Sequence, residues 1–228
     1  MPARVRFHEE LEQLELEVLG AGELAERAVA RAVDALVRHD PAEAQAVVAG
    51  DDEIDARYLD TERRALELLA LQTPVAGDLR LISAILHANL HLERVGDIAV
   101  NIAKIFLSVR HLPASPAVLT HLREMGDLGR GMLRTALEAF ARRDLELCLQ
   151  LPRMDDPVDR LNLRMYGEVA ALAGDPAMLE WGLRMTVVSR QLERVADHAV
   201  DIGEQVGFLL TGEFREFTDA SHPEGGGG

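Results

Sequence analysis

The sequence predicts an all-α protein made of two tandem, homologous three-helix bundles. Its composition is the first indication, because 48% of the residues are hydrophobic but only 4% are aromatic. Leu, Ala, Val, Ile and Met must therefore build the core, as is typical of helix bundles rather than sheets. Prolines and capping residues divide the chain into segments of helical length, and the second half of the chain repeats the first.

Three helices are expected in the first half, at about residues 7–38, 41–71 and 78–109. Pro41 suits a first helical turn, and Asp40 before it is a good N-cap. Asp78 is expected to cap the third helix, after a turn at Pro74. Residues 111–116 contain two prolines, which cannot continue a helix, so the first bundle is predicted to cover residues 1–110.

The second half is expected to contain helices at about residues 117–143, 145–173 and 176–212, which form the second bundle, residues 117–212. Residues 213–228 are predicted to be a flexible acidic and glycine-rich tail.

An internal repeat supports this division. At an offset of 100 residues, 93–102 match 193–202 with seven identities in ten, and at an offset of 104, Asp51 and Asp55 fall on Asp155 and Asp159. Such similarity indicates two homologous units, each with apolar helix faces that pack together.

Each half carries two acidic pairs with four-residue spacing, which places both carboxylates of a pair on one helix face. Like charges there cost about 0.2–0.5 kcal/mol per pair in an isolated helix, so repeated pairs call for a reason. A bound cation would remove the repulsion. The predicted metal ligands are Asp51, Asp55, Glu93, Asp97 and Asn101 in the first half and Asp155, Asp159, Glu193, Asp197 and Asp201 in the second.

The two pairs of each half are predicted to face each other across a helical hairpin. In the first half the pairs are equally far from Pro74, and in the second half they are equally far from Pro176. A cluster of carboxylates suits divalent or ferric ions that accept oxygen ligands, such as magnesium, calcium, manganese or iron, with zinc as a further option. Additional ligands could come from Asp52, Asp156 and His198, although Ile98 occupies the place of His198 in the first half.

The alternative interpretation is that these acids lie on solvated helix faces or pair with nearby arginines: Arg57, Arg94, Arg160 and Arg194. The duplication and the matching register favour the metal sites. His87 and His91 also have ligand spacing, but Val187 stands in the place of His87, so a role on the helix surface or in the core is expected there.

Several classes of function are disfavoured. The net charge of −15 argues against nucleic acid as a partner, and the single cysteine, Cys148, excludes an internal disulfide and a thiolate metal cluster. No stretch resembles a signal peptide or a membrane span, so the protein is expected to be cytoplasmic, without membrane insertion. No nucleophile–base arrangement or glycine-rich phosphate loop is evident, and a di-iron oxidase would need Glu-x-x-His motifs. An enzyme is therefore not expected.

The residues that carry a family resemblance are 71–80, the segment Glu93-Arg94-Val95-Gly96-Asp97, and its repeat at 193–202. These segments resemble the PhoU family, and the resemblance extends over nearly the whole chain to about residue 212. It implies two three-helix bundles, metal ions bound by Glu93, Asp97, Glu193 and Asp197, and frequent homodimers.

The resemblance also implies a function. It suggests a negative regulator of phosphate uptake and of the phosphate-starvation response, which contacts the ATPase subunit of the phosphate ABC transporter and a sensor histidine kinase. Two other functions remain open from the residues alone: a metal-buffering helical bundle without a signalling partner, and a structural adaptor whose acids bind nothing.

Overall fold

The computed structural model describes residues 3–71 and 74–217, which are helical with connecting turns and contain no strand. Within these residues there are seven helices: α1 (Ala3–Arg38), α2 (Pro41–Ala49), α3 (Asp51–Leu71), α4 (Ala76–Val109), α5 (Pro116–Arg142), α6 (Leu145–Ala170) and α7 (Pro176–Thr211). The all-α fold class and its two repeated units are confirmed.

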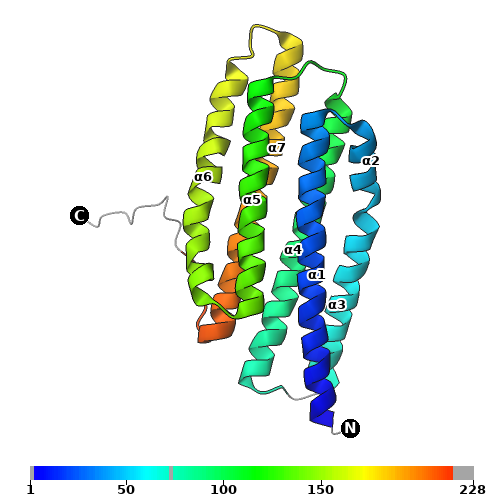
Figure 1. Cartoon of the computed structure of the whole chain (residues 1–228), viewed down its shortest axis with the longest axis vertical. Coiled ribbons are helices and arrows are strands. Elements are labelled where there is room, and N and C mark those ends of the chain that lie inside the picture. Colours follow the sequence, from blue (N-terminus) through cyan, green and yellow to red (C-terminus); the bar gives the residue numbers. More distant parts are fainter. Residues whose placement is uncertain (1–2, 72–73, 218–228) are drawn as a thin grey trace, which may run out of the picture.

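The helices run along the long axis of an elongated bundle (Figure 1). In the first unit α2 and α3 pack on α1 and α4, and in the second unit α6 packs on α5 and α7. The units meet through α1 against α5 and α4 against α7. The four long helices α1, α4, α5 and α7 thus form the centre, and the arms that carry the aspartate pairs, α3 and α6, lie outside it.

Two local predictions were wrong. The helix expected at 41–71 is interrupted at Gly50, which ends α2 while Asp51 begins α3. The equivalent residue in the second unit is Met154, and there α6 continues through it and through Pro152 and Pro157. Asp78 is not an N-cap: α4 is capped by Val75, which makes no side-chain hydrogen bond, and Asp78 lies in the first turn.

An aspartate N-cap precedes the outer helical segment of each unit, at equivalent positions 40 and 144. Asp40 Oδ1 accepts hydrogen bonds from the backbone N–H groups of Ala42 and Glu43, as predicted. Asp144 caps α6 in the same way, and Asp175 caps α7. Each cap satisfies backbone donors that the first turn of a helix leaves open.

One continuous apolar core joins the two units. Helices α1 and α5 approach closely at Gly22, where a Cβ atom would lie only 2.4 Å from Leu137 Cδ1. Ion pairs flank this contact, with Arg130 3.0 Å from Glu26 and Arg123 3.0 Å from Asp34. The units therefore share their interior and are not connected only by the linker.

Buried polar side chains tie the two arms of each hairpin at equivalent positions. Asn89 Nδ2 on α4 donates to the carbonyl oxygen of Tyr58 on α3, at 2.9 Å. Ser189 Oγ on α7 donates to Asn162 Oδ1 on α6, at 2.7 Å. Asn89 and Ser189 each lie one helical turn before the acidic pair of their helix, so these bonds set the register beside the carboxylates.

Replacing Ser189 with Ala is expected to destabilise the fold by about 1–3 kcal/mol, because buried Asn162 Oδ1 would lose its donor. Chemical denaturation would measure the change. The matched control is Ser108→Ala, at an exposed serine that donates only to a carbonyl in its own helix. A loss no larger than that of the control would contradict the proposed role of the hydrogen bond.

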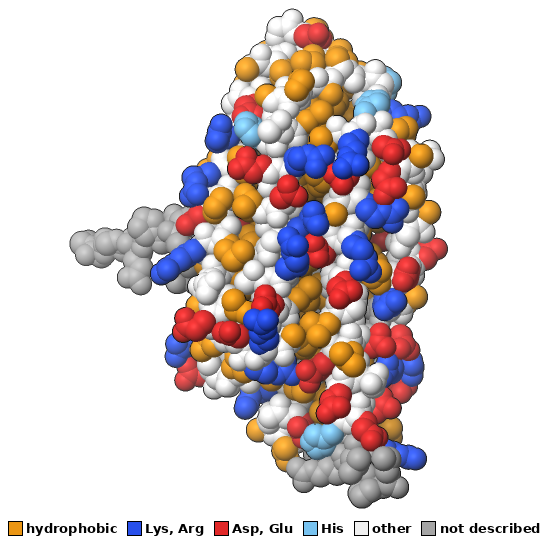
Figure 2. Space-filling model, viewed as in Figure 1, with side chains coloured by type: hydrophobic (Ala, Val, Ile, Leu, Met, Phe, Trp, Pro, Cys, Tyr) orange, Lys and Arg blue, Asp and Glu red, His pale blue; other side chains and the backbone are white. Residues whose placement is uncertain are grey.

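On the face shown in Figure 2, acidic and basic side chains are interspersed, without a continuous basic stripe. In the described parts of the chain, none of the helices has the length and apolar character that a membrane crossing requires. Most of the predicted tail, from residue 218 onward, lies outside the described residues, as do residues 72–73 of the first hairpin turn.

Candidate metal centres

The first acidic cluster lies between α3 and α4. Asp51 and Asp55 come from the first turns of α3, and Glu93 and Asp97 from the middle of α4. Burial raises the pKa of Glu93, and the negative charges of Asp97, Asp55 and Asp51 raise it further. The pKa of Asp51 is raised by burial and then by Asp55 and Asp97. The structure therefore brings these four predicted ligands into one electrostatically coupled group.

Close packing of the two helices produces this grouping. A Cβ atom on Gly96, which lies between Glu93 and Asp97, would be 2.9 Å from Ile54 Cδ1. Ile54 lies between Asp51 and Asp55 on α3 and is buried. Because Gly96 has no side chain, α3 can approach α4 at the level of the carboxylates.

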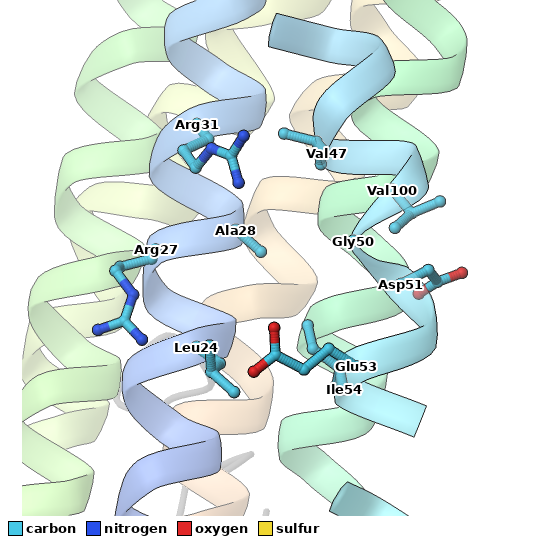
Figure 3. Close-up of a pocket in the computed structure, with 10 residues that line it drawn as sticks. All are labelled: Leu24, Arg27, Ala28, Arg31, Val47, Gly50, Asp51, Glu53, Ile54 and Val100. Carbon is cyan, nitrogen blue, oxygen red and sulfur yellow. The ribbon is translucent and has the colours of Figure 1, made fainter. Parts of the chain in front are cut away.

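A pocket lies beside the break at Gly50 and is lined by residues of α1, α2, α3 and α4 (Figure 3). Arg27 and Arg31 of α1 line it, and the carboxylate of Asp51 points away from both arginines. Arg31 Nε is 2.5 Å from Glu43, and Arg27 is 3.5 Å from Glu23. Each arginine is thus paired with a glutamate and not with Asp51, whose carboxylate is instead coupled to Asp97 of α4.

The second acidic cluster lies between α6 and α7. Burial raises the pKa of Asp197; Arg190 opposes this shift, and the charges of Asp159 and Asp201 add to it. Asp159 therefore faces Asp197 across the hairpin, as predicted. Asp155 and Glu193 are each 7% exposed, whereas their equivalents Asp51 and Glu93 are only half-buried. The second cluster is thus the better shielded from solvent, and Arg190 pairs with Glu193 there.

The remaining predicted ligands are placed less centrally. Asn101 and Asp52 are exposed, and Asp156 is half-buried. Arg94 contacts Glu93 at 3.4 Å and Asp97 at 3.9 Å, but its own side chain is 53% exposed. Arg57 pairs with Glu17 and Glu53, not with the predicted ligands. The arginine-pairing alternative therefore applies in part, through Arg94 in the first unit; in the second unit the pairing arginine is Arg190, which was not among those predicted.

Neither carboxylate cluster, in the part of the chain that the structure describes, brings three ligand atoms close enough together to surround one ion. Among the described residues, the only group of three or more His, Cys, Asp or Glu with ligand atoms all within 4.8 Å of one another is His91, His198 and Asp201. The two carboxylate clusters are wider than this, so a single small ion would require the side chains to close around it. Binding of ions by the predicted ligands stays a prediction.

The histidine group was not predicted. His91 of α4 belongs to the first unit, and His198 and Asp201 of α7 belong to the second. His87 Nδ1, by contrast, lies 2.7 Å from the carbonyl oxygen of Ser83 in its own helix, and the side chain is exposed, as expected of a helix-surface role. No local signal in the sequence indicates the group, because it depends on the register of α4 against α7, which belong to different units.

Cys148 takes no part in any of these groups. It is fully buried, and its thiol donates to the carbonyl oxygen of Asp144 at 3.3 Å. Burial raises the pKa of the Cys148 thiol to about 11, so it is protonated at neutral pH and unsuited to nucleophilic or metal chemistry.

Replacing Asp197 with Asn is expected to stabilise the metal-free protein at pH 7. The pKa of Asp197 is raised in the folded state, so its ionisation disfavours folding. This destabilisation is absent below the unfolded pKa, near 3.8, and grows as pH rises through the folded pKa. Melting temperatures of chelated wild type and variant should therefore converge near pH 4 and separate at pH 7. A variant that melts lower at pH 7 would contradict the electrostatic account.

Comparisons with known proteins agree with this architecture. The family described as PhoU domain matches residues 18–106 and 122–206. A relative from Caulobacter vibrioides, named phosphate-specific transport system accessory protein PhoU homolog, is 37% identical over 91% of this chain and 90% of its own length. A relative of the same name from Pseudomonas putida is 35% identical over 95% of this chain and 83% of its own.

Two solved structures have the same fold. The crystal structure of PhoU from Pseudomonas aeruginosa superposes with a TM-score of 0.86 at 34% identity, covering 91% of this chain and 100% of that one. The phosphate transport system regulatory protein PhoU from Streptococcus pneumoniae gives a TM-score of 0.84 at 30% identity, covering 92% and 99%. Together with the two matched domains, these similarities show that the chain belongs to the PhoU family.

Proposed function

We propose that this protein is a cytoplasmic negative regulator of phosphate uptake and of the phosphate-starvation response. It acts by binding the ATPase subunit of the phosphate ABC transporter and a sensor histidine kinase, not by catalysis. The observation that carries the proposal is the PhoU family match in both repeats, over nearly all of the helical body. The relatives named above are accessory or regulatory proteins of phosphate transport.

The carboxylate clusters supply the second part of the proposal, which is that each hairpin binds divalent or ferric ions. The raised pKa values of Asp51, Glu93 and Asp197 support it, because burial raises each of them first and neighbouring carboxylates raise them further. A cation among these oxygen atoms would neutralise the repulsion and fix α3 against α4 and α6 against α7. A rigid pair of hairpins would in turn present a defined surface to a protein partner.

Deleting the gene and growing the cells in phosphate-rich medium tests the regulatory role. We expect high alkaline phosphatase activity and high phosphate uptake in the deletion strain, and restoration of repression by the wild-type gene. The Asp97→Asn/Asp197→Asn variant should be produced at normal levels but should not restore repression. Full repression in the deletion strain would overturn the proposal.

The second candidate function is a metal buffer without a phosphate-signalling partner. The recurrence of an acidic cluster in both units of this one chain favours it over a purely structural role. It would be supported if the deletion strain kept normal phosphate control but lost tolerance to an excess or a shortage of metal. Homodimer formation, which the family resemblance implies, is a further proposal that the molar mass measured by light scattering would test.

A further inference from the structure

We propose that His91, His198 and Asp201 form an additional binding site for one zinc-class divalent ion at the junction between the two repeats. This site shares Asp201 with the predicted ligands of the second carboxylate cluster, but its other two ligands are imidazoles. It joins α4 of the first unit to α7 of the second, whereas each carboxylate cluster lies within a single unit. The inference is independent of the proposed regulatory function.

The distances among the three ligand atoms fit a tetrahedral ion. His91 Nδ1 lies 3.2 Å from His198 Nδ1, and both nitrogens lie 3.4 Å from Asp201 Oδ2. Two atoms that each lie 2.0–2.1 Å from a zinc ion at tetrahedral angles are about 3.3–3.4 Å apart. The three atoms therefore already occupy one face of such a tetrahedron, and the fourth position is available to water or to a group from a partner.

The surroundings of the site favour binding over simple solvation. The side chains of His91 and His198 are only 18% and 15% exposed. His198 Nε2 is buried and has no hydrogen-bond partner among the described residues, so Nδ1 is the nitrogen that this ring directs at another group. Two imidazoles and one carboxylate select borderline ions such as zinc, cobalt or nickel over magnesium and calcium, which prefer oxygen.

The internal repeat shows that this arrangement is not general to the fold. Helices α4 and α7 run antiparallel (Figure 1), so the pair His91 and His198 has an equivalent pair at Gln191 and Ile98. Asn101 is the equivalent of Asp201. The equivalent positions lack both nitrogen ligands and the carboxylate, so only one such site is expected per chain.

The repeat also supplies substitutions that the fold already accommodates. His91→Gln and His198→Ile introduce the residues found at the equivalent positions, so both variants are expected to fold. His87→Gln is the matched control, because His87 lies one turn earlier on α4 and bonds only within its own helix. Circular dichroism and melting of the metal-free proteins would confirm that all variants are folded.

The test is titration of the chelated full-length protein with zinc and with cobalt. Wild type and His87→Gln should bind one zinc equivalent more than either ligand variant. Their cobalt complexes should show the strong visible absorption of tetrahedral coordination with nitrogen ligands. His91→Gln and His198→Ile should lose that absorption, and their affinity should fall by more than the roughly 10–100-fold that follows loss of an outer-shell partner.

Equal zinc stoichiometry and affinity in wild type and His91→Gln would overturn the inference. So would a cobalt spectrum unchanged by both histidine substitutions. In either case the three residues would serve only as a polar contact between the repeats. Because the readouts are metal affinity and spectrum, a failure here would leave the phosphate-regulation proposal unaffected, and a failure of that proposal would leave this site intact.

Discussion

Substituting Asp97 and Asp197 with Asn in one chain is expected to remove most of the metal that the carboxylate clusters bind. Each substitution removes the charge of an acid that interacts electrostatically with an acid on the opposite helix of its hairpin. Asp97 interacts with Asp51, and Asp197 interacts with Asp159. An amide oxygen is a much weaker ligand for a hard cation than a carboxylate. Elemental analysis of the purified proteins after loading with manganese or iron would measure the loss.

The control for this experiment is Glu67→Gln/Glu180→Gln, which removes the same number of charges at exposed positions of α3 and α7, more than three helical turns from the predicted ligands. It should retain most of the metal. Helicity should be unchanged in both double variants, because the apolar core is untouched. Equal metal content in wild type and Asp97→Asn/Asp197→Asn would show that the clusters are not metal sites.

Replacing Leu133 with Ala is expected to lower the free energy of unfolding by about 2–5 kcal/mol. Leu133 is fully buried on α5, the helix that contacts α1, α6 and α7. The truncation leaves a cavity in the interior that both units share. For a chain of this size the melting temperature should fall by roughly 2–4 °C per kcal/mol. Calorimetry would measure it.

The matched control is Leu163→Ala, the same change at a side chain that is 70% exposed on α6, where an effect within about 0.5 kcal/mol is expected.

The shared core also predicts that both units unfold together in one cooperative transition. Trp181, the only tryptophan, is buried in the second unit, so its fluorescence reports that unit while circular dichroism reports both. Two separate transitions in wild type would contradict a common core.

Local patterns in the sequence were sufficient to predict most of the architecture. Prolines and aspartate caps mark the ends of the arms, and the repeat marks the two units. The break at Gly50 was missed because the helical pattern continues across it. The glycine followed by Asp51, Asp52 and Glu53 has the composition of a helix end and a new helix start. In the second unit Met154 stands in place of that glycine, and the helix is continuous.

The sequence also predicted which acids face one another, because equal distance from a turn determines register in a helical hairpin. It did not predict how deeply each cluster is buried, since that depends on how the units pack. Gly96 and Ile54 determine how closely α3 approaches α4, and no sequence pattern marks either residue as a contact between these helices. The group of His91, His198 and Asp201 depends on contact between α4 and α7, which belong to different repeats, so no local motif indicates it.

The most direct test of the central claim, that each hairpin binds metal ions through its facing carboxylates, is anomalous diffraction from crystals grown with manganese or iron. The account predicts anomalous density between α3 and α4 beside Glu93 and Asp97, and between α6 and α7 beside Glu193 and Asp197. Ions that occupy other surfaces, with no anomalous density in either hairpin, would contradict it.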